Sequence, residues 1–506
     1  MATLICAGHI MNSTHVARDG FAYTFLADDE PRRFNVINST PYRWRRIAIH
    51  SYQIPDWSGV WPKYIESGQV IEVVTEKASG GGSRKDTGAE VVYKLEETCR
   101  PMSFRLAFNP TRAQDPDVRV TFLQELKTRW TNKGGEIDLG KRIAYGGVNF
   151  ILAGTEAELY SNEGPLGWMQ EQLEIVGKYP LNQIVMPRSH HAGMNKGLRG
   201  IGLAHDKTTL TQTRSPYEQI AIGGVRVLDF RPYERSKGTF SEGHFSNIGG
   251  LHHGMIGISL EDIINDINRF NKESPGELII IDIHDSESWV GKAKGINNKG
   301  KFRPLEVEDR ARLWKQFEQL EHRFVLPAGA QNIPEMPLEA FIGTGQSAVL
   351  IHTPGPWTKD KAFPGGKAGY VSNRNFPRTA YWSDTEKPDV LVTEQTATLR
   401  SKKGASGRGG DIHDSQWILR LAAMDYVTPI QSLNDLAQAA WGRLYGAMWK
   451  MVDDRVYPNW ISFDAIETEE GKALAMAMNR CIVAGKCGEL GGKAPNAEPL
   501  DLNCRA

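Results

Sequence analysis

Two histidines and an arginine are the residues of this chain best suited to acid–base chemistry. His190 lies in a segment that begins with apolar residues at position 184, Arg231 ends the segment 227–231, and His253 lies in the segment 251–254. One imidazole can accept a proton while the other donates one, and a guanidinium can neutralise the charge that develops on a phosphoryl group. These residue types therefore favour cleavage of a phosphodiester.

Further polar residues follow short apolar stretches in the second part of the chain. With the first three, the set is His190, Asp229 and Arg231, His253, His284 and Asp285, Glu394, and Asp464. When parallel strands form a barrel, their carboxyl ends meet at one rim, and that rim carries the active site. We expect these residues to converge there.

Eight segments are expected to be the strands that position these residues. They are residues 183–186, 225–230, 250–253, 277–283, 348–352, 390–393, 417–422 and 459–463. Amphipathic helices are expected between them, for example after the capping pair Ser259 and Asp262, and over residues 306–322. A doubly wound sheet would alternate in the same way, but no glycine-rich fingerprint follows the first strand, so a (β/α)8 TIM-type barrel is favoured.

The first part of the chain has a different pattern. Up to about residue 154, polar and apolar residues alternate, and turn-rich breaks separate the stretches. This predicts a multidomain α/β plus β chain with an N-terminal antiparallel β-sandwich over residues 1–160 and the barrel over 161–475. The tail 476–506 contains Cys481 and Cys487, which either form a local disulfide or stay reduced.

Composition limits the classes of partner. The 506 residues carry a net charge of +0, which argues against a protein devoted to the nucleic-acid backbone. We expect no transmembrane segment, because no stretch of about eighteen apolar residues occurs. The first twenty residues lack the order of a signal peptide, so the sequence predicts no export address and leaves a cytoplasmic or a non-classically secreted protein open.

The segments around the two histidines resemble a known family. Residues 187–193 (PRSHHAG), 228–231 (LDFR) and 252–254 (HHG) are similar in order and spacing to the X region of phosphatidylinositol-specific phospholipase C, especially the metal-independent bacterial type. The resemblance covers about residues 165–467. It places the chain in the PLC-like phosphodiesterase superfamily.

The resemblance implies roles for individual residues. His190 would be the general base on a neighbouring substrate hydroxyl, which attacks phosphorus to give a cyclic phosphodiester, and His253 would be the general acid. Arg231 would neutralise the phosphoryl oxygens, where metal-dependent relatives hold calcium. Asp464 would orient His190, and Trp382 matches a tryptophan of the substrate loop.

Departures from the family pattern concern the substrate. His191 replaces the aspartate that normally assists the acid, and Asp229 is the candidate to substitute for it. His284 stands in place of an inositol-contacting lysine, His352 lies beside the position of an inositol-contacting arginine, and Glu394 replaces an aspartate. We therefore expect a phosphodiester substrate, which includes phospholipids, but not plain phosphatidylinositol.

Two other classes of function remain open. A divalent-metal-dependent phosphodiesterase, or a phospholipase D-like enzyme on the same barrel, would use His190, His191, Asp229, His284 and Asp285 as ligands. Arg231 would repel such a cation, so no cofactor is expected and a divalent cation is the alternative.

A catalytically weak, membrane-binding or toxin-like module is the other class. The N-terminal part resembles the β-domain of fungal phospholipase-like proteins and, more loosely, β-sandwich cytolysins. Trp44, Trp57 and Trp61, near the basic residues 43–46, are either core residues or contacts to a membrane or a glycan.

Overall fold

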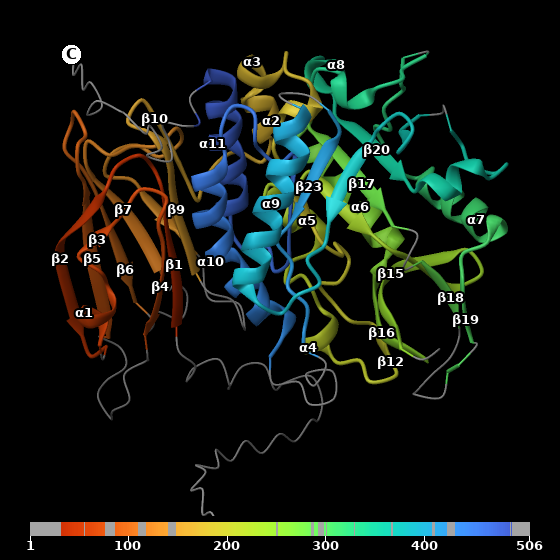
Figure 1. Cartoon of the computed structure of the whole chain (residues 1–506), viewed down its shortest axis with the longest axis horizontal. Helices are drawn as coiled ribbons and strands as arrows, with labels where there is room; N and C mark the ends of the chain where they lie inside the picture. The colour runs from red at the N-terminus through yellow and green to blue at the C-terminus, as the bar shows by residue number, and fades with distance from the viewer. Residues whose placement is uncertain are drawn as a thin grey trace, which may run out of the picture.

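The fold is taken from a computed structural model that has two parts lying side by side (Figure 1). It describes residues 32–54, 56–75, 87–109, 118–139, 148–248, 251–284, 288–291, 298–299, 301–327, 329–365, 368–406, 410–422, 431–485 and 487. Within these residues, no helix is both long and apolar enough to cross a membrane.

The first part is a sandwich of two sheets. One sheet is antiparallel in the order β3-β2-β5-β6-β7-β8, and the other has the order β10-β9-β1-β4. Their strands are β1 (Arg32–Ser39), β2 (Trp44–Tyr52), β3 (Tyr64–Ile65), β4 (Val70–Thr75), β5 (Gly88–Leu95), β6 (Met102–Phe108), β7 (Val118–Gln124), β8 (Glu136–Asp138), β9 (Val148–Thr155) and β10 (Glu158–Ser161), with the short helix α1 (Trp57–Val60). The predicted antiparallel arrangement holds except for β1 and β9, which pair in parallel.

The tryptophans of the sandwich lie in its core. Trp44 and Trp57 are 0% exposed and Trp61 is 2% exposed, and they pack with Phe34 and Phe104 between the two sheets. Alternation along β2 directs Trp44 inward. Of the two alternatives that the sequence left open for these three side chains, the structure supports the core and not a contact to a membrane or a glycan.

The second part contains one parallel sheet of eight strands. Its order is β21-β20-β17-β13-β11-β24-β23-β22. The strands are β11 (Met186–Ser189), β13 (Val227–Phe230), β17 (Leu278–Ile283), β20 (Ala348–Thr353), β21 (Tyr370–Ser372), β22 (Arg378–Tyr381), β23 (Ile412–Gln416) and β24 (Trp460–Phe463). The first and last strands, β11 and β24, are neighbours, as in a barrel, but no pairing joins β21 to β22 among the described residues, so the barrel is open there.

Five of the expected strands occur with shifted ends, and three expectations are wrong. Residues 251–253 belong to a different sheet, residues 390–393 lie in the helix α9 (Pro388–Ser406), and residues 417–422 follow β23 instead of forming a strand. The sequence analysis missed β21, β22 and β23 because they are short and two of them are polar. A short valine-rich stretch such as residues 390–393 can occur in a helix as well as in a strand, because so few apolar residues do not distinguish the two periodicities.

Helices cover the sheet and join the two parts. The expected capping pair starts α6 (Leu260–Glu273), and the second expected helix is shorter than predicted, α7 (Val307–Phe317). α10 (Leu433–Met451) contacts β1 and β4, and α11 (Glu470–Ala484) contacts β9 and β10, so both helices lie between sandwich and barrel (Figure 1). The remaining helices are α2 (Trp168–Glu171), α3 (Leu173–Val176), α4 (Asp206–Thr209), α5 (Pro216–Ala221), α8 (Glu339–Ile342), and the 3-10 turns η3 (Leu181–Gln183), η4 (Ile333–Glu335) and η5 (Gly355–Lys359).

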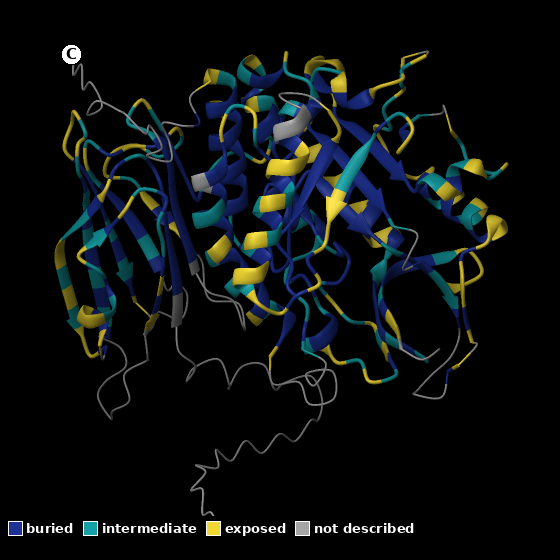
Figure 2. Cartoon of the chain, in the orientation of Figure 1, coloured by how far each residue is buried: buried dark blue, intermediate teal, exposed yellow. Residues whose placement is uncertain are grey.

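A buried polar network lies at this junction. Asn35 on β1 donates to Asn149 on β9 (2.7 Å), and Asn149 donates to Glu470 at the start of α11 (2.8 Å). Gln438 on α10 lies 3.5 Å from the Asn35 amide. All four side chains are buried, as are most residues of α11 (Figure 2). Burial raises the pKa of Glu470 to about 7.

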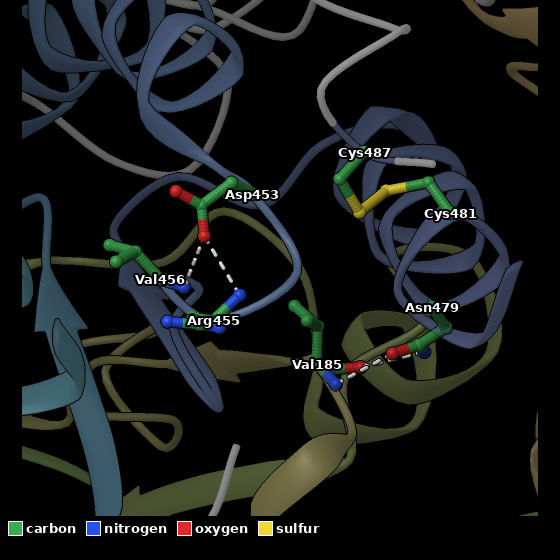
Figure 3. The surroundings of a disulfide bond; sticks show 7 residues. All are labelled: Val185, Asp453, Arg455, Val456, Asn479, Cys481 and Cys487. Carbon is green, nitrogen blue, oxygen red and sulfur yellow. Dashed lines mark hydrogen bonds between the residues drawn. A yellow bond between two sulfur atoms is a disulfide. The ribbon is translucent and has the colours of Figure 1, made fainter. Parts of the chain in front are cut away.

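The second half of the helix α11 is held by a side-chain contact and by a disulfide. Its Asn479 bonds both backbone groups of Val185, immediately before β11, at 2.7 and 3.1 Å (Figure 3). At its end, Cys481 and Cys487 form a disulfide with an S–S distance of 2.03 Å. The helix also runs across the boundary between residues 475 and 476, where the sequence analysis placed the start of the tail.

A second, smaller sheet projects from the barrel beside the carboxyl end of β13. We call it the accessory sheet, with the order β12-β16-β15-β14-β18-β19. Its strands are β12 (Arg199–Ile201), β14 (Pro232–Ser236), β15 (Thr239–Ile248), β16 (Leu251–Ser259), β18 (Trp289–Gly291) and β19 (Phe302–Pro304). Its strands β14, β15 and β16 lie between β13 and α6 in the chain, and β14 begins two residues after β13 ends, so this part of the sheet lies next to the barrel rim.

Candidate functional site

His190 and Asp464 meet at the rim of the barrel. His190 directly follows β11 and Asp464 directly follows β24, and these two strands pair with each other. The His190 Nδ1 and Asp464 Oδ1 atoms are 2.7 Å apart. A carboxylate only accepts, so Nδ1 carries a proton and, in the neutral ring, the lone pair is on Nε2. The Asp464 backbone oxygen accepts from Trp441 (3.0 Å), and the His190 carbonyl accepts from Gln212 (2.8 Å), so both residues are held in place.

His191 turns away from solvent into a buried pair with Glu242 of β15. Its Nδ1 lies 3.0 Å from Glu242 Oε1, both side chains are 0% exposed, and His191 has a φ of 45°. Burial, with Arg231 nearby, lowers the pKa of His191 well below its ordinary value, and burial raises the pKa of Glu242 well above its own. Thus His191, which stands where the similar sequence pattern has an aspartate, lies next to the carboxyl group of Glu242.

Arg231 and Asp229 lie beside this pair. The Arg231 Nη2 atom is 3.3 Å from Asp229 Oδ2, and the same oxygen accepts from the His191 backbone (3.1 Å). Burial alone would raise the pKa of Asp229, but Arg231 and Arg188 outweigh it and hold that pKa below its usual range. Asp229 is therefore a charged carboxylate that forms ion pairs with both Arg231 and Arg188.

The floor of the site contains charged residues that the sequence analysis missed. Arg188 on β11 contacts Asp282 on β17 (2.7 Å) and Asp229 (3.3 Å), and Arg378 on β22 contacts Asp282 (3.2 Å) and Asp414 on β23 (3.1 Å). A signal was present, because a charged residue within a buried strand needs a partner of opposite charge. Arg188 and Asp282 both interrupt such strands.

His284 and His352 differ in their access to the site. His284 is 20% exposed at the end of β17, with Nε2 at 3.1 Å from Arg188 Nη2. His352 is buried on β20 between Asp282 Oδ1 (2.8 Å) and the carbonyl of Phe376 (3.3 Å). His284 can therefore face a substrate, whereas His352 supports Asp282 from behind.

Trp382 and Glu394 lie on the side where β22 ends. Trp382 is 52% exposed directly after β22, and the preceding Tyr381 donates to Glu394 Oε2 (3.2 Å). Glu394 was expected at a strand end, but it lies on the helix α9. An aromatic pair thus borders the mouth of the barrel.

His253 was expected at a barrel strand end, and this is wrong because it lies on β16 of the accessory sheet. There its Nδ1 accepts from the backbone of Leu203 (3.1 Å), and Ser246 pairs with it across the sheet. His244 precedes Ser246 by two residues on β15, on the same face. The His244 ring centroid is 6.4 Å from that of His190 and 4.2 Å from that of His191.

The sequence analysis missed His244 because it recognised the HHG segment and not the hairpin that precedes it. His244 Nδ1 lies 2.8 Å from the carbonyl oxygen of Thr209 and therefore carries a proton. The available signal was alternation, since Glu242 and His244 are separated by two along a strand and share a face.

A metal site was a possible use of the acidic residues. Asp229, Asp282 and His284 offer ligand atoms within 4.8 Å of one another, whereas His190 and His191 bond to other carboxylates and Asp285 lies outside the described residues. The Arg188 guanidinium lies 2.7–3.3 Å from atoms of these three side chains. The cluster is thus already neutralised by an arginine, which fits a divalent cation poorly.

Fold and site together define an open parallel α/β barrel with a histidine–aspartate pair and an arginine at its carboxyl rim. No family model and no curated protein sequence matches the chain. Among solved structures, it is similar to phosphatidylinositol-specific phospholipase C of Staphylococcus aureus. A structure concerned with membrane binding of that enzyme matches with a TM-score of 0.42 and 13% identity, over 62% of this chain and 99% of that chain.

Two variants of the same enzyme give similar values. A form containing pentafluorophenylalanine matches with a TM-score of 0.44 and 14% identity, over 62% of this chain and 99% of that chain. A histidine-to-tyrosine mutant matches with 0.39 and 14%, over 63% and 99%.

Proposed function

We propose that this protein is a phosphodiesterase of the phospholipase C type, which acts by general acid–base catalysis without a metal. The observation that carries the proposal is the 2.7 Å contact between His190 Nδ1 and Asp464, because it directs the basic Nε2 atom away from the carboxylate. The 13% exposure of His190 gives a substrate access to that ring.

The reaction begins with a hydroxyl group of the substrate next to the phosphodiester. His190 Nε2 takes its proton, and the hydroxyl oxygen forms a bond to phosphorus while the bond to the leaving alcohol breaks. The phosphorus stays in a cyclic phosphodiester, and the leaving oxygen takes a proton from a general acid. Asp464 stabilises the imidazolium that forms on His190.

Arg231 neutralises the phosphoryl oxygens in this mechanism. It is 11% exposed at the end of β13, and Asp229 orients its guanidinium from below. A guanidinium in a poorly solvated site stabilises the extra charge of the pentacoordinate state more strongly than it would in water.

We assign the general acid to His244 in place of His253. Its ring is within reach of a substrate that contacts His190, and the bond from Nδ1 to the carbonyl of Thr209 leaves Nε2 as the atom that delivers the proton. His253 pairs with Ser246, which lies two residues beyond His244 on β15, at about 3.3 Å per residue. His253 also already accepts from the Leu203 backbone.

The substrate differs from plain phosphatidylinositol in this proposal. His284 brings an imidazole, in place of a lysine, to the headgroup side, and Arg188 and Arg378 lie behind it. Trp382 and Tyr381 are exposed at the same rim and support a substrate with an apolar portion, such as a phospholipid, with peripheral contact to the membrane.

Three alanine variants test the proposal with an aryl phosphodiester and with phosphoinositides as substrates. His190→Ala and His244→Ala are expected to lose at least about a hundredfold in kcat/KM, the usual contribution of a general acid or base. His253→Ala is the matched control and is expected to lose less than about tenfold. Equal activity of all four proteins would refute the mechanism, and a loss confined to His190→Ala and His253→Ala would return the acid role to His253.

A further inference from the structure

A cavity lies on the accessory sheet, and none of the histidines of the candidate site lines it. It has a volume of about 420 Å³ and is lined by Leu198, Arg199, Tyr233, Arg235, Ile256 and Gly291. This volume is in the range of small-molecule sites, and no acidic side chain is among the six lining residues. The chemistry proposed above uses none of them.

Strand register shows why these residues share one face. Arg199 pairs with Ile256, which pairs with Gly243, and a side chain on Gly243 would meet Tyr233. Gly291 follows, by two residues, the residue that pairs with Tyr233. Since alternate residues of a strand point to opposite faces, all these positions face the same way.

His244 and Glu242 project from the other face of the same sheet. His244 pairs with Met255, the neighbour of Ile256, and Glu242 is the neighbour of Gly243. The cavity and His244, the proposed general acid, therefore lie on opposite faces of one sheet.

The floor of the cavity is packed and largely apolar. Tyr233 and Ile256 belong to a small core with Ile201, Phe245 and Phe302, and the Tyr233 hydroxyl donates to the Gly291 carbonyl (2.5 Å). Leu198, which is 44% exposed, adds an apolar side at the opening.

The opening carries positive charge from two separate strands. Burial raises the pKa of Tyr233 on β14 to about 12, and the positive charge of Arg199 on β12 opposes part of this rise. The charge of Arg199 is therefore close enough to the Tyr233 hydroxyl to affect its ionisation. Arg235 is exposed, and among the described residues it forms no ion pair. Two guanidiniums match the double charge and the oxygen geometry of a phosphate monoester.

We infer that this cavity is a second, non-catalytic binding site for a phosphate monoester, held by Arg199 and Arg235 with its organic substituent against Leu198, Tyr233 and Ile256. The phosphate comes either from a soluble metabolite or from a lipid headgroup, and both present the same dianion. A ligand there rests on the back of the sheet that carries His244.

The test uses the full chain carrying Arg231→Gln, which removes the phosphate contact of the proposed catalytic site. Phenyl phosphate is the soluble probe, titrated by calorimetry at low salt. Vesicles of phosphatidylcholine with and without phosphatidic acid are the lipid probe, measured by cosedimentation. Arg199→Gln and Arg235→Gln are added singly and together, and Arg119→Gln on β7 of the sandwich is the matched control.

We expect binding in at least one arm, weakened at least about tenfold by the double substitution and unchanged by Arg119→Gln. Binding of phenyl phosphate alone identifies a soluble ligand, and binding that needs phosphatidic acid identifies a lipid. Equal affinity with and without the two arginines, or no saturable binding in either arm, would overturn the inference. Because turnover is not measured, this outcome is independent of whether the proposed reaction occurs.

Discussion

Arg188 Nη2 and Asp282 Oδ2 are 2.7 Å apart inside the barrel, where the two side chains are 1% and 0% exposed. The same guanidinium contacts Asp229 on β13 and Ser462 on β24, so one residue of β11 joins three neighbouring strands. Buried charge is tolerated here because the network balances it.

Arg188→Met is therefore expected to destabilise the barrel severely. The substitution keeps an unbranched side chain but leaves the Asp282 and Asp229 carboxylates without their main partner, at a cost of about 3–5 kcal/mol in the free energy of unfolding. Urea denaturation followed by circular dichroism measures it. Arg119→Met, which changes a half-buried arginine of the sandwich, should change this free energy by less than about 1 kcal/mol. Equal midpoints for the two variants would contradict the role of the network.

Asp464→Asn is expected to reduce kcat at least about a hundredfold with little change in KM. The amide can present its NH2 group to His190 Nδ1, which favours the wrong tautomer and removes the charge that stabilises the imidazolium. Steady-state kinetics with an aryl phosphodiester measure both constants. Asp138→Asn, on the exposed edge of the sandwich, controls for the loss of a carboxylate elsewhere. A change in KM alone would assign Asp464 to substrate binding.

Chelation is expected to leave activity unchanged. The Arg188 guanidinium already lies between Asp229, Asp282 and His284, the cluster most suited to a cation among the described residues. Activity is measured before and after incubation with EDTA, and again after magnesium or calcium is added. Complete loss that magnesium restores would replace the proposed mechanism by a metal-dependent one.

Stability is expected to fall as pH rises from 4.5 to about 7 because of Glu470. Its pKa is 4.5 in an ordinary environment and about 7 in the folded protein, because burial at the junction of the two parts favours the neutral form. Between these values the folded state holds a proton that the unfolded chain has lost, so the free energy of unfolding decreases with rising pH, by about 3 kcal/mol in total, and levels off above pH 7.

Unfolding of the wild type and of Glu470→Gln between pH 5 and 8 isolates this contribution. The glutamine keeps the shape of the side chain but does not titrate, so its profile should be flatter by that amount. Glu261→Gln on the exposed face of α6 should follow the wild type. Parallel profiles for Glu470→Gln and the wild type would show that the network does not hold the proton.

Local sequence patterns predicted much of the fold. Period-two alternation identified the sandwich, and apolar runs such as residues 278–283 identified the strands of the barrel, because burial on one or both faces dictates the residue type at each position. The capping pair Ser259 and Asp262 marked the start of α6 correctly, because a cap depends on neighbours three residues apart. His190, Arg231 and Asp464 were recognised from their order along the chain.

The tertiary structure alone decided which side chains meet. The hairpin before residue 251 brings His244, and not His253, close to His190, and the buried strands bring Arg188 to Asp282 across the barrel. It also placed Trp44 in the core and His191 against Glu242. These relationships join residues far apart in sequence through strand register and packing, whereas the sequence by itself determines only the local preferences on which such packing acts.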